Sequence, residues 1–151
     1  MQNTGSDVEE LLARGKTIQF KPIGYSMYPL FVPGRDQAVV APVGDHVLRR
    51  GDVALYRREG SILVLHRVWK CGRDGLYMVG DNQTQIEGPL KREQVRGILT
   101  GIIRNGRYFS ARNPLYYTGA QIWLILRPVR PFLAKGISKC KKVFGKLQRG
   151  R

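Results

Sequence analysis

The stretch Gly24-Tyr25-Ser26-Met27-Tyr28-Pro29-Leu30 separates an apolar segment from a long β-rich region. Its glycine and proline are residues that favour turns. We therefore expect Ser26 to lie on a loop that leaves a strand. A serine held on such a loop is a candidate nucleophile, and this hypothesis organises the interpretation of the rest of the chain.

Short runs of strand-forming residues follow one another at close spacing up to about residue 110, which predicts a mainly β fold. Glu59-Gly60 and Asn105-Gly106 are hairpin turn signals. The expected strands cover residues 16–23, 37–43, 52–56, 62–69, 76–79, 95–104 and 107–109. Residues 81–89 are predicted to form a polar loop, and residues 91–94 one helical turn. The pattern leaves open whether the sheet is parallel or closes like a barrel.

Helices are expected at the two ends of the chain. Residues 6–14 follow a capping-box pattern and end at Gly15. From Asn113 onward apolar residues recur every three or four positions, the helical period, and lysines recur on the other side. Pro128 and Pro131 should divide this region into two helical pieces. We thus expect a compact β-rich catalytic domain over 1–112 and a basic amphipathic helical tail over 113–151.

The net charge of +15 is concentrated in the C-terminal third of the 151 residues. The first 93 residues hold 13 basic and 11 acidic side chains, a net charge of +2, whereas residues 94–151 hold 13 Lys and Arg and no acidic residue. Such a segment attracts polyanions. We expect an anionic membrane surface to be the partner of residues 120–151, and the alternative is a helix docked on the domain with its lysines in water. We do not expect nucleic acid, since no reading helix or aromatic platform is visible.

Several classes of site and location are excluded by composition. Two histidines and two distant cysteines, Cys71 and Cys140, offer no metal-binding spacing, and they favour a reduced compartment. No metal or cofactor is therefore expected. Acidic residues near the N-terminus are unlike a secretory signal peptide. The longest apolar run, residues 122–126, is far below the ~20 residues of a spanning helix, so a cytoplasmic or peripheral membrane location is expected.

A serine nucleophile needs a base, and His66 is the candidate. By the two-residue period of a strand, His66 shares one face with Val64 and Val68. Asp81 and Glu87, in the expected polar loop, are the acids available to orient the histidine. Spacing alone makes this a weak pattern, because most proteins of this size contain such residues.

Four further stretches strengthen the hypothesis. The serine stretch resembles the serine box of the signal peptidase I superfamily, which includes LexA-like self-cleaving repressors. In family order there follow Arg50-Gly51-Asp52-Val53, Leu65-His66-Arg67-Val68, Val79-Gly80-Asp81-Asn82 and a closing strand that begins at Val95. Together these boxes cover roughly residues 16–104. A histidine at the base position resembles the branch of archaeal and endoplasmic-reticulum signal peptidases.

The resemblance implies roles for four residues. Ser26 would attack the scissile carbonyl and donate its backbone N–H to the oxyanion, and His66 would be the general base. The assisting acid would be Asp81, in the box itself, or Glu87, which stands where a second Asp is usual. Gly24 occupies a position where family members often supply a second oxyanion hydroxyl. The family's N-terminal anchor and large inserted β-region are not expected here.

Apolar and aromatic residues around the serine are the candidates for substrate binding. Met27, Tyr28 and Leu30, with Phe31, would either line a groove for small or aliphatic side chains or belong to the core. The resemblance implies that substrate binds as an extended strand beside the catalytic one.

Three functions follow from these observations. The leading one is a serine endopeptidase that cleaves precursor or exported peptides. The second is a catalytically inactive peptide-binding module of the same fold, favoured by Gly24 and Glu87. The third is a nucleic-acid-associated regulator like the self-cleaving repressors, against which stand the lack of a preceding helix-turn-helix domain and the histidine at position 66.

Overall fold

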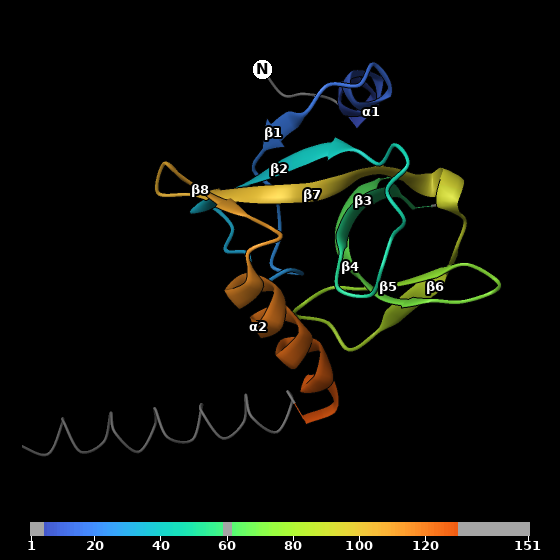
Figure 1. Cartoon of the computed structure of the whole chain (residues 1–151), viewed down its shortest axis with the longest axis vertical. Helices are drawn as coiled ribbons and strands as arrows, with labels where there is room; N and C mark the ends of the chain where they lie inside the picture. The colour runs from blue at the N-terminus through green and yellow to red at the C-terminus, as the bar shows by residue number, and fades with distance from the viewer. Residues whose placement is uncertain (1–4, 59–61, 130–151) are drawn as a thin grey trace, which may run out of the picture.

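The computed structural model describes residues 5–58 and 62–129, and this part of the chain is an eight-stranded sheet with a helix at each end (Figure 1). The mainly β class with a short N-terminal helix and a C-terminal helix is confirmed. The elements in chain order are α1 (Gly5–Ala13), β1 (Ile18–Phe20), β2 (Asp36–Pro42), β3 (Val53–Arg57), β4 (Leu63–Cys71), β5 (Leu76–Val79), β6 (Ile86–Leu90), η1 (Arg92–Gln94), β7 (Val95–Arg104), β8 (Arg107–Ser110), α2 (Pro114–Ile125) and η2 (Arg127–Val129).

Every strand pairing is antiparallel, which answers the question of strand direction left open by the sequence. The strand order is β1-β2-β7-β3-β4-β5-β6, with β8 paired to β7. Irregularities interrupt the register in β2, β3, β4 and β5. Bulges increase twist and bend strands, and the β3–β6 half of the sheet curves accordingly, as Figure 1 shows.

Two apolar clusters lie on opposite faces of the central strands because successive side chains of a strand alternate between faces. The first packs α1, the serine loop and the sheet together, and includes Leu12, Met27, Phe31, Leu65 and Leu99. The second fills the curved half, and its buried members are Leu48, Ala54, Tyr56, Val68, Met78, Leu90 and Val95. The serine loop is therefore anchored by one core, and the strand face that carries His66 belongs to the other.

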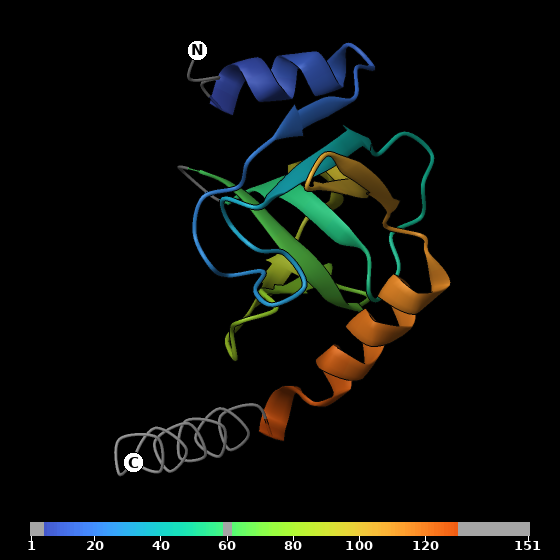
Figure 2. The same ribbon diagram turned by 90° about the vertical axis from the view of Figure 1, so that its left-hand side faces the viewer.

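Helix α2 begins where the sequence placed it. Pro114 occupies the first turn, and the Asn113 side chain accepts hydrogen bonds from the backbone N–H groups of Leu115 and Tyr116, a cap that satisfies donors left free at a helix start. The helix lies at the end of the sheet opposite α1 (Figure 2). The η2 turn follows at Pro128, and the predicted second piece beyond residue 129 lies outside the described residues. No described helix is long and apolar enough to cross a membrane.

Strand β6 corrects the prediction of a polar loop over residues 81–89. Ile86 and Leu90 both pair with β5, whereas Gly88 and Pro89 between them are exposed. A proline is tolerated here because β6 is the edge of the sheet, where a missing N–H disrupts no ladder. The first predicted strand is also shorter than expected, three residues instead of eight.

Candidate active site

Ser26 lies in the loop between β1 and β2, and its backbone is bound to the Gly-Asp-Asn box. The Asn82 N–H donates to the Ser26 carbonyl at 2.7 Å. A Cβ on Gly80 would meet the same carbonyl oxygen at 2.7 Å, so only glycine permits this close approach. Buried Met27 anchors the other side of the serine in the core. Two stretches that are 54 residues apart in the chain therefore form one unit.

His66 lies on β4 with its ring enclosed, at 2% exposure. It stands opposite Ala54 of β3, and Tyr56 is the next residue of β3 on the same face. The Tyr56 hydroxyl oxygen is 3.1 Å from Nδ1 of His66. Both described polar contacts of the ring use Nδ1, so Nε2 remains available for a serine hydroxyl.

Glu87 completes a chain of hydrogen bonds behind the histidine. The Tyr56 hydroxyl donates to Glu87 Oε2 at 2.7 Å, and Glu87 Oε1 lies 3.7 Å from His66 Nδ1. A phenol has one O–H, and Tyr56 donates it in the hydrogen bond to the carboxylate of Glu87. The Tyr56 oxygen therefore accepts a hydrogen bond from Nδ1–H of His66. This arrangement fixes the tautomer in which Nε2 carries the lone pair, the form that a general base requires.

The charge states of these groups agree with that assignment. Burial lowers the pKa of His66, against the opposing charge of Glu87, so the imidazole is neutral at neutral pH. Hydrogen bonds from Tyr56 and Arg58 outweigh the effect of burial and lower the pKa of Glu87, which stays ionised. Burial and the Glu87 carboxylate raise the pKa of Tyr56 well above its usual value, which keeps the phenol protonated.

Asp81 has a different partner. Its two carboxylate oxygens accept from Arg67 Nε at 2.8 Å and Arg67 Nη2 at 2.7 Å, and both side chains are almost fully buried. Arg67 also donates to the Gly51 carbonyl at 2.8 Å. This buried pair joins three of the sequence boxes, since Gly51, Arg67 and Asp81 belong to different ones. Of the two acids predicted to assist His66, the structure places Glu87 beside the ring and Asp81 against Arg67.

Helix α2 contacts both the loop that carries Asp81 and the turn before β3. Trp123 Nε1 of α2 donates to the Asp81 carbonyl at 2.7 Å, and Arg127 of the following η2 turn donates to the Thr84 carbonyl. The carbonyl of Arg50 accepts from Tyr117 at 3.3 Å and from Gln121 at 3.1 Å. The helix therefore bridges the turn before β3 and the loop after β5.

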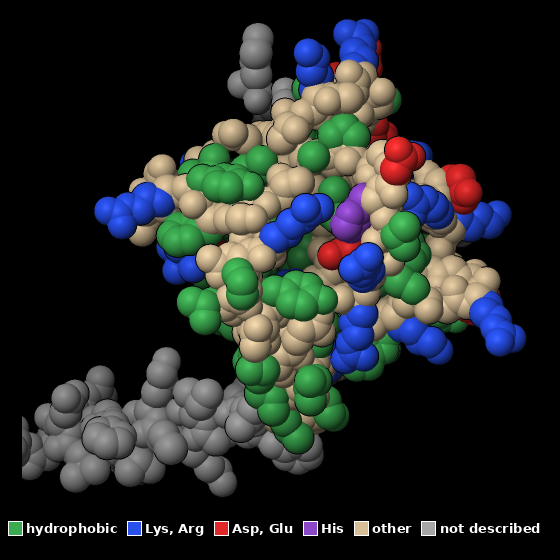
Figure 3. Space-filling model, in the orientation of Figure 1, with side chains coloured by type: hydrophobic (Ala, Val, Ile, Leu, Met, Phe, Trp, Pro, Cys, Tyr) green, Lys and Arg blue, Asp and Glu red, His purple; other side chains and the backbone are tan. Residues whose placement is uncertain are grey.

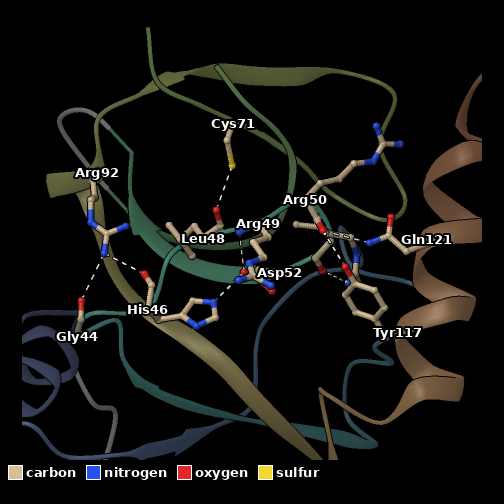
Figure 4. A network of polar contacts seen from close by, with 12 residues as sticks. Gly44, His46, Leu48, Arg49, Arg50, Asp52, Cys71, Arg92, Tyr117 and Gln121 are labelled. Carbon is tan, nitrogen blue, oxygen red and sulfur yellow. Dashed lines mark hydrogen bonds and ion pairs between the residues drawn. The ribbon is translucent and has the colours of Figure 1, made fainter. Parts of the chain in front are cut away.

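The turn before β3 is itself braced by a second polar network (Figure 4). Asp52 accepts from the Arg49 N–H at 2.8 Å and contacts His46 Nε2 at 2.9 Å. Arg92 donates to the carbonyls of Gly44 and His46, and Cys71 donates to the carbonyl of Leu48. These contacts fix the loop over 43–52, and none of them involves Ser26 or His66.

A hollow of about 890 Å³ opens beside Glu87. It is lined by polar side chains of the loop after β5, including Asn82, by Arg58 and Gln94, and by the apolar residues Ile86 and Leu90 of β6. It touches the serine loop through Asn82 and the histidine through Glu87. No group of three or more acidic, histidine or cysteine side chains suited to a metal occurs among the described residues.

The predicted site residues fall into two groups. In the first group, Ser26 is held close to the end of β5 by Asn82 and Gly80. In the second group, Glu87 lies beside His66. No hydrogen bond joins Ser26 Oγ to His66 within the part of the chain that the structure describes. The three candidate substrate-binding residues differ in exposure: Met27 is core, Leu30 is half-buried and Tyr28 is exposed.

Tyr56, Arg67 and Trp123 were missed as members of the site. For Tyr56 a signal existed, because the strands predicted over 52–56 and 62–69 are neighbours in the chain, and their antiparallel register places Tyr56 diagonally across from His66. For Arg67 the signal was its position inside an apolar strand, because a buried guanidinium requires a buried acid as its counter-charge. Nothing in the local sequence pairs Trp123 with the loop after β5.

Comparison with known proteins gives no match to a protein-family model and no match to a curated protein. The likeness to the signal peptidase I superfamily therefore remains an expectation that rests on the sequence boxes themselves.

Proposed function

We propose that this protein is a serine endopeptidase, resembling signal peptidase, that cleaves precursor or exported peptides. The observation that carries the proposal is the chain from Glu87 through Tyr56 to Nδ1 of His66, at 2.7 and 3.1 Å. It supports His66 as a neutral, oriented base with Nε2 available. The family resemblance assigns Ser26 as the nucleophile, and the hydrogen bond from the Asn82 N–H to its carbonyl holds its loop against the loop that follows β5.

The reaction proceeds by acyl transfer. Ser26 Oγ attacks the peptide carbonyl while its proton passes to Nε2 of His66. The positive charge that develops on the ring is stabilised by Glu87 across 3.7 Å and through the Tyr56 hydroxyl. His66 then gives the proton to the leaving amine, and water hydrolyses the ester on Ser26. The backbone N–H of Ser26 is the oxyanion donor that the family resemblance implies.

The substrate segment binds as an added strand beside β4. Strand β5 pairs with β4 only over Arg67 to Cys71, whereas residues 63–66 pair with β3 on their other side. An extended peptide placed along this half of β4 gains main-chain hydrogen bonds next to His66. Tyr25 and Tyr28, exposed with their rings in edge-to-face contact, flank Ser26 and offer aromatic surface to substrate side chains.

Cleavage of unstructured precursor peptides by the full-length protein tests the proposal. Mass spectrometry of the products should show cleavage by the wild type and none by Ser26→Ala. Ser110→Ala is the matched control, because Ser110 Oγ accepts a hydrogen bond from the nearby Arg112 N–H and is not a predicted site residue. Equal cleavage by wild type and Ser26→Ala would remove Ser26 from the mechanism.

A peptide-binding module without catalysis is the second candidate. The observation that favours it is the lack of a hydrogen bond between Ser26 Oγ and His66 among the described residues. This function predicts that wild type and Ser26→Ala bind the same peptides equally well and that neither cleaves them. Binding and cleavage measured on one peptide set therefore separate the two candidates.

A further inference from the structure

Helix α2 carries a second apolar face that nothing in the described part of the chain covers. Its exposed residues are spaced by three and four positions, so they line one side of the helix and continue into η2. They are Leu115 (86% exposed), Ile122 (53%), Ile125 (66%) and Val129 (42%). Thr118, also exposed, completes the row. We call these residues the outer stripe.

The opposite side of α2 is already occupied. Ala120 and Leu124 are fully buried, and Trp123 donates to the Asp81 carbonyl. An ordinary surface helix buries one apolar face and shows a polar one to water. This helix shows apolar residues on both sides, and exposed apolar patches of this kind mark contact with a partner or a membrane.

The surroundings of the outer stripe are basic. Neither α2 nor η2 contains an acidic residue, Arg112 and Arg127 flank the helix, and no Asp or Glu occurs after Glu93. Eight Lys and Arg residues follow between positions 130 and 151. Figure 3 shows hydrophobic side chains gathered over the lower end of α2, with Lys and Arg side chains on the same face of the molecule.

We propose that the outer stripe docks on an anionic lipid surface. Apolar side chains on one face of a helix with basic residues around it are the features of an interfacial helix, whose affinity adds apolar burial to attraction by anionic lipids. A protein partner fits less well, because protein interfaces concentrate their energy in Trp, Tyr and Arg, and the outer stripe contains none of these residues.

Docking would also orient the molecule. Trp123 of α2 bonds Asp81, and the next residue, Asn82, bonds the carbonyl of Ser26. A lipid surface that holds α2 thus holds the Ser26 loop close to the headgroups. This inference goes beyond the peptidase proposal and stands whether or not Ser26 is catalytic.

Sedimentation of the full-length protein with vesicles tests the proposal. Wild type should sediment with vesicles of phosphatidylcholine and phosphatidylglycerol, and much less with phosphatidylcholine alone. The double variant Ile122→Gln/Ile125→Gln should bind the anionic vesicles about tenfold or more weakly, because it lacks two aliphatic side chains that become buried in the lipid on docking. Both residues are exposed, so the variant keeps its fold, which circular dichroism checks.

The matched control is Val47→Gln/Ile62→Gln, which changes two exposed aliphatic residues that belong neither to α2 nor to η2 and should bind like wild type. Unchanged binding of the Ile122/Ile125 variant would overturn the proposal and assign attachment to charge alone. A wild-type protein that stays in solution with anionic vesicles would overturn it too. Binding by a chain ending at Val129 but not by the full chain would show that residues 130–151 occupy the outer stripe instead.

Discussion

The hydroxyl oxygen of Tyr56 lies 3.1 Å from Nδ1 of His66 and donates its own proton to Glu87 at 2.7 Å. This places a phenol between the histidine and the carboxylate of Glu87. Tyr56, His66 and Glu87 come from β3, β4 and β6. Tyr56 and His66 lie on the sheet face of the second core cluster, which includes Ala54 and Val68. Loss of any one member changes the charge or the tautomer of the others.

Tyr56→Phe tests the bridging role of the phenol. The change removes the acceptor of Nδ1–H and one donor to Glu87, so His66 loses the bond that fixes its tautomer. We expect kcat/KM for peptide cleavage to fall on the order of tenfold or more, and the free energy of unfolding to fall by about 1–3 kcal/mol. Tyr77→Phe is the control, because that hydroxyl bonds Asp74 at the surface. Full activity in Tyr56→Phe would show that the phenol is only a packing group.

The pH profile of cleavage reports the charge of His66. Since burial lowers the pKa of His66, kcat/KM should stay level down to about pH 6.5, the value of an exposed histidine, and decline only in more acidic solution. Glu87→Gln removes the charge that raises this pKa, so the acidic decline should move to still lower pH and the plateau should fall. Glu93→Gln, on the exposed η1 turn, should leave the profile unchanged. A decline that begins above pH 7 would contradict a neutral, buried base.

The same pKa shift affects stability. The folded protein keeps His66 neutral over a range of pH in which the unfolded chain already binds the proton, so the unfolded state gains protons first. The free energy of unfolding should therefore decrease as pH falls below about 6.5. Chemical denaturation at a series of pH values measures this slope, and His66→Gln should reduce it.

Asp81→Asn tests whether Asp81 is structural. The substitution leaves the Arg67 guanidinium buried without a counter-charge, and breaking a buried ion pair costs about 3–5 kcal/mol. The surface pair of Glu10 and Arg14 is the control, and Glu10→Gln should cost at most about 1 kcal/mol. Denaturant midpoints compare the two variants. A loss of cleavage in Asp81→Asn without loss of stability would return Asp81 to the role of histidine partner.

Gly80→Ala tests the contact between the Gly-Asp-Asn box and the serine loop. The new methyl would meet the Ser26 carbonyl and the Gln83 side chain, both at 2.7 Å, so the serine loop must move. We expect kcat/KM to fall about tenfold or more, because small displacements of reacting groups cost much of the rate. Gly119→Ala in α2 meets nothing within 4 Å, and it should raise helix stability by up to about 1 kcal/mol with activity unchanged.

The sequence was informative where local pattern decides structure. Alternating apolar residues and hairpin turn signals located seven of the eight strands, and the helical period from Asn113 onward marked the start of α2. Strand β6 escaped because Gly88 and Pro89 are turn residues in most contexts, and only the position at the sheet edge makes them compatible with a strand.

Tertiary pairing was the part that local pattern could not decide. Asp81 and Glu87 both lie within reach of the His66 strand, and the choice between them depends on where Arg67 points. Burial of Arg67 requires a full counter-charge, and Asp81 supplies it, whereas Glu87 on the edge strand extends toward Tyr56. Likewise the contact of Trp123 with the Asp81 carbonyl depends on how α2 packs, which no spacing in the sequence encodes.

Mapping the adduct of a phosphonofluoridate probe tests the central claim most directly, because such a probe reacts much faster with an activated serine hydroxyl than with an ordinary one. Intact mass and peptide mapping of the full-length protein should show one adduct, on Ser26, which disappears in Ser26→Ala, slows strongly in His66→Gln and persists in Ser110→Ala. A wild-type protein that gains no adduct on Ser26, or that is labelled equally fast in His66→Gln, would contradict a Ser26 nucleophile activated by His66.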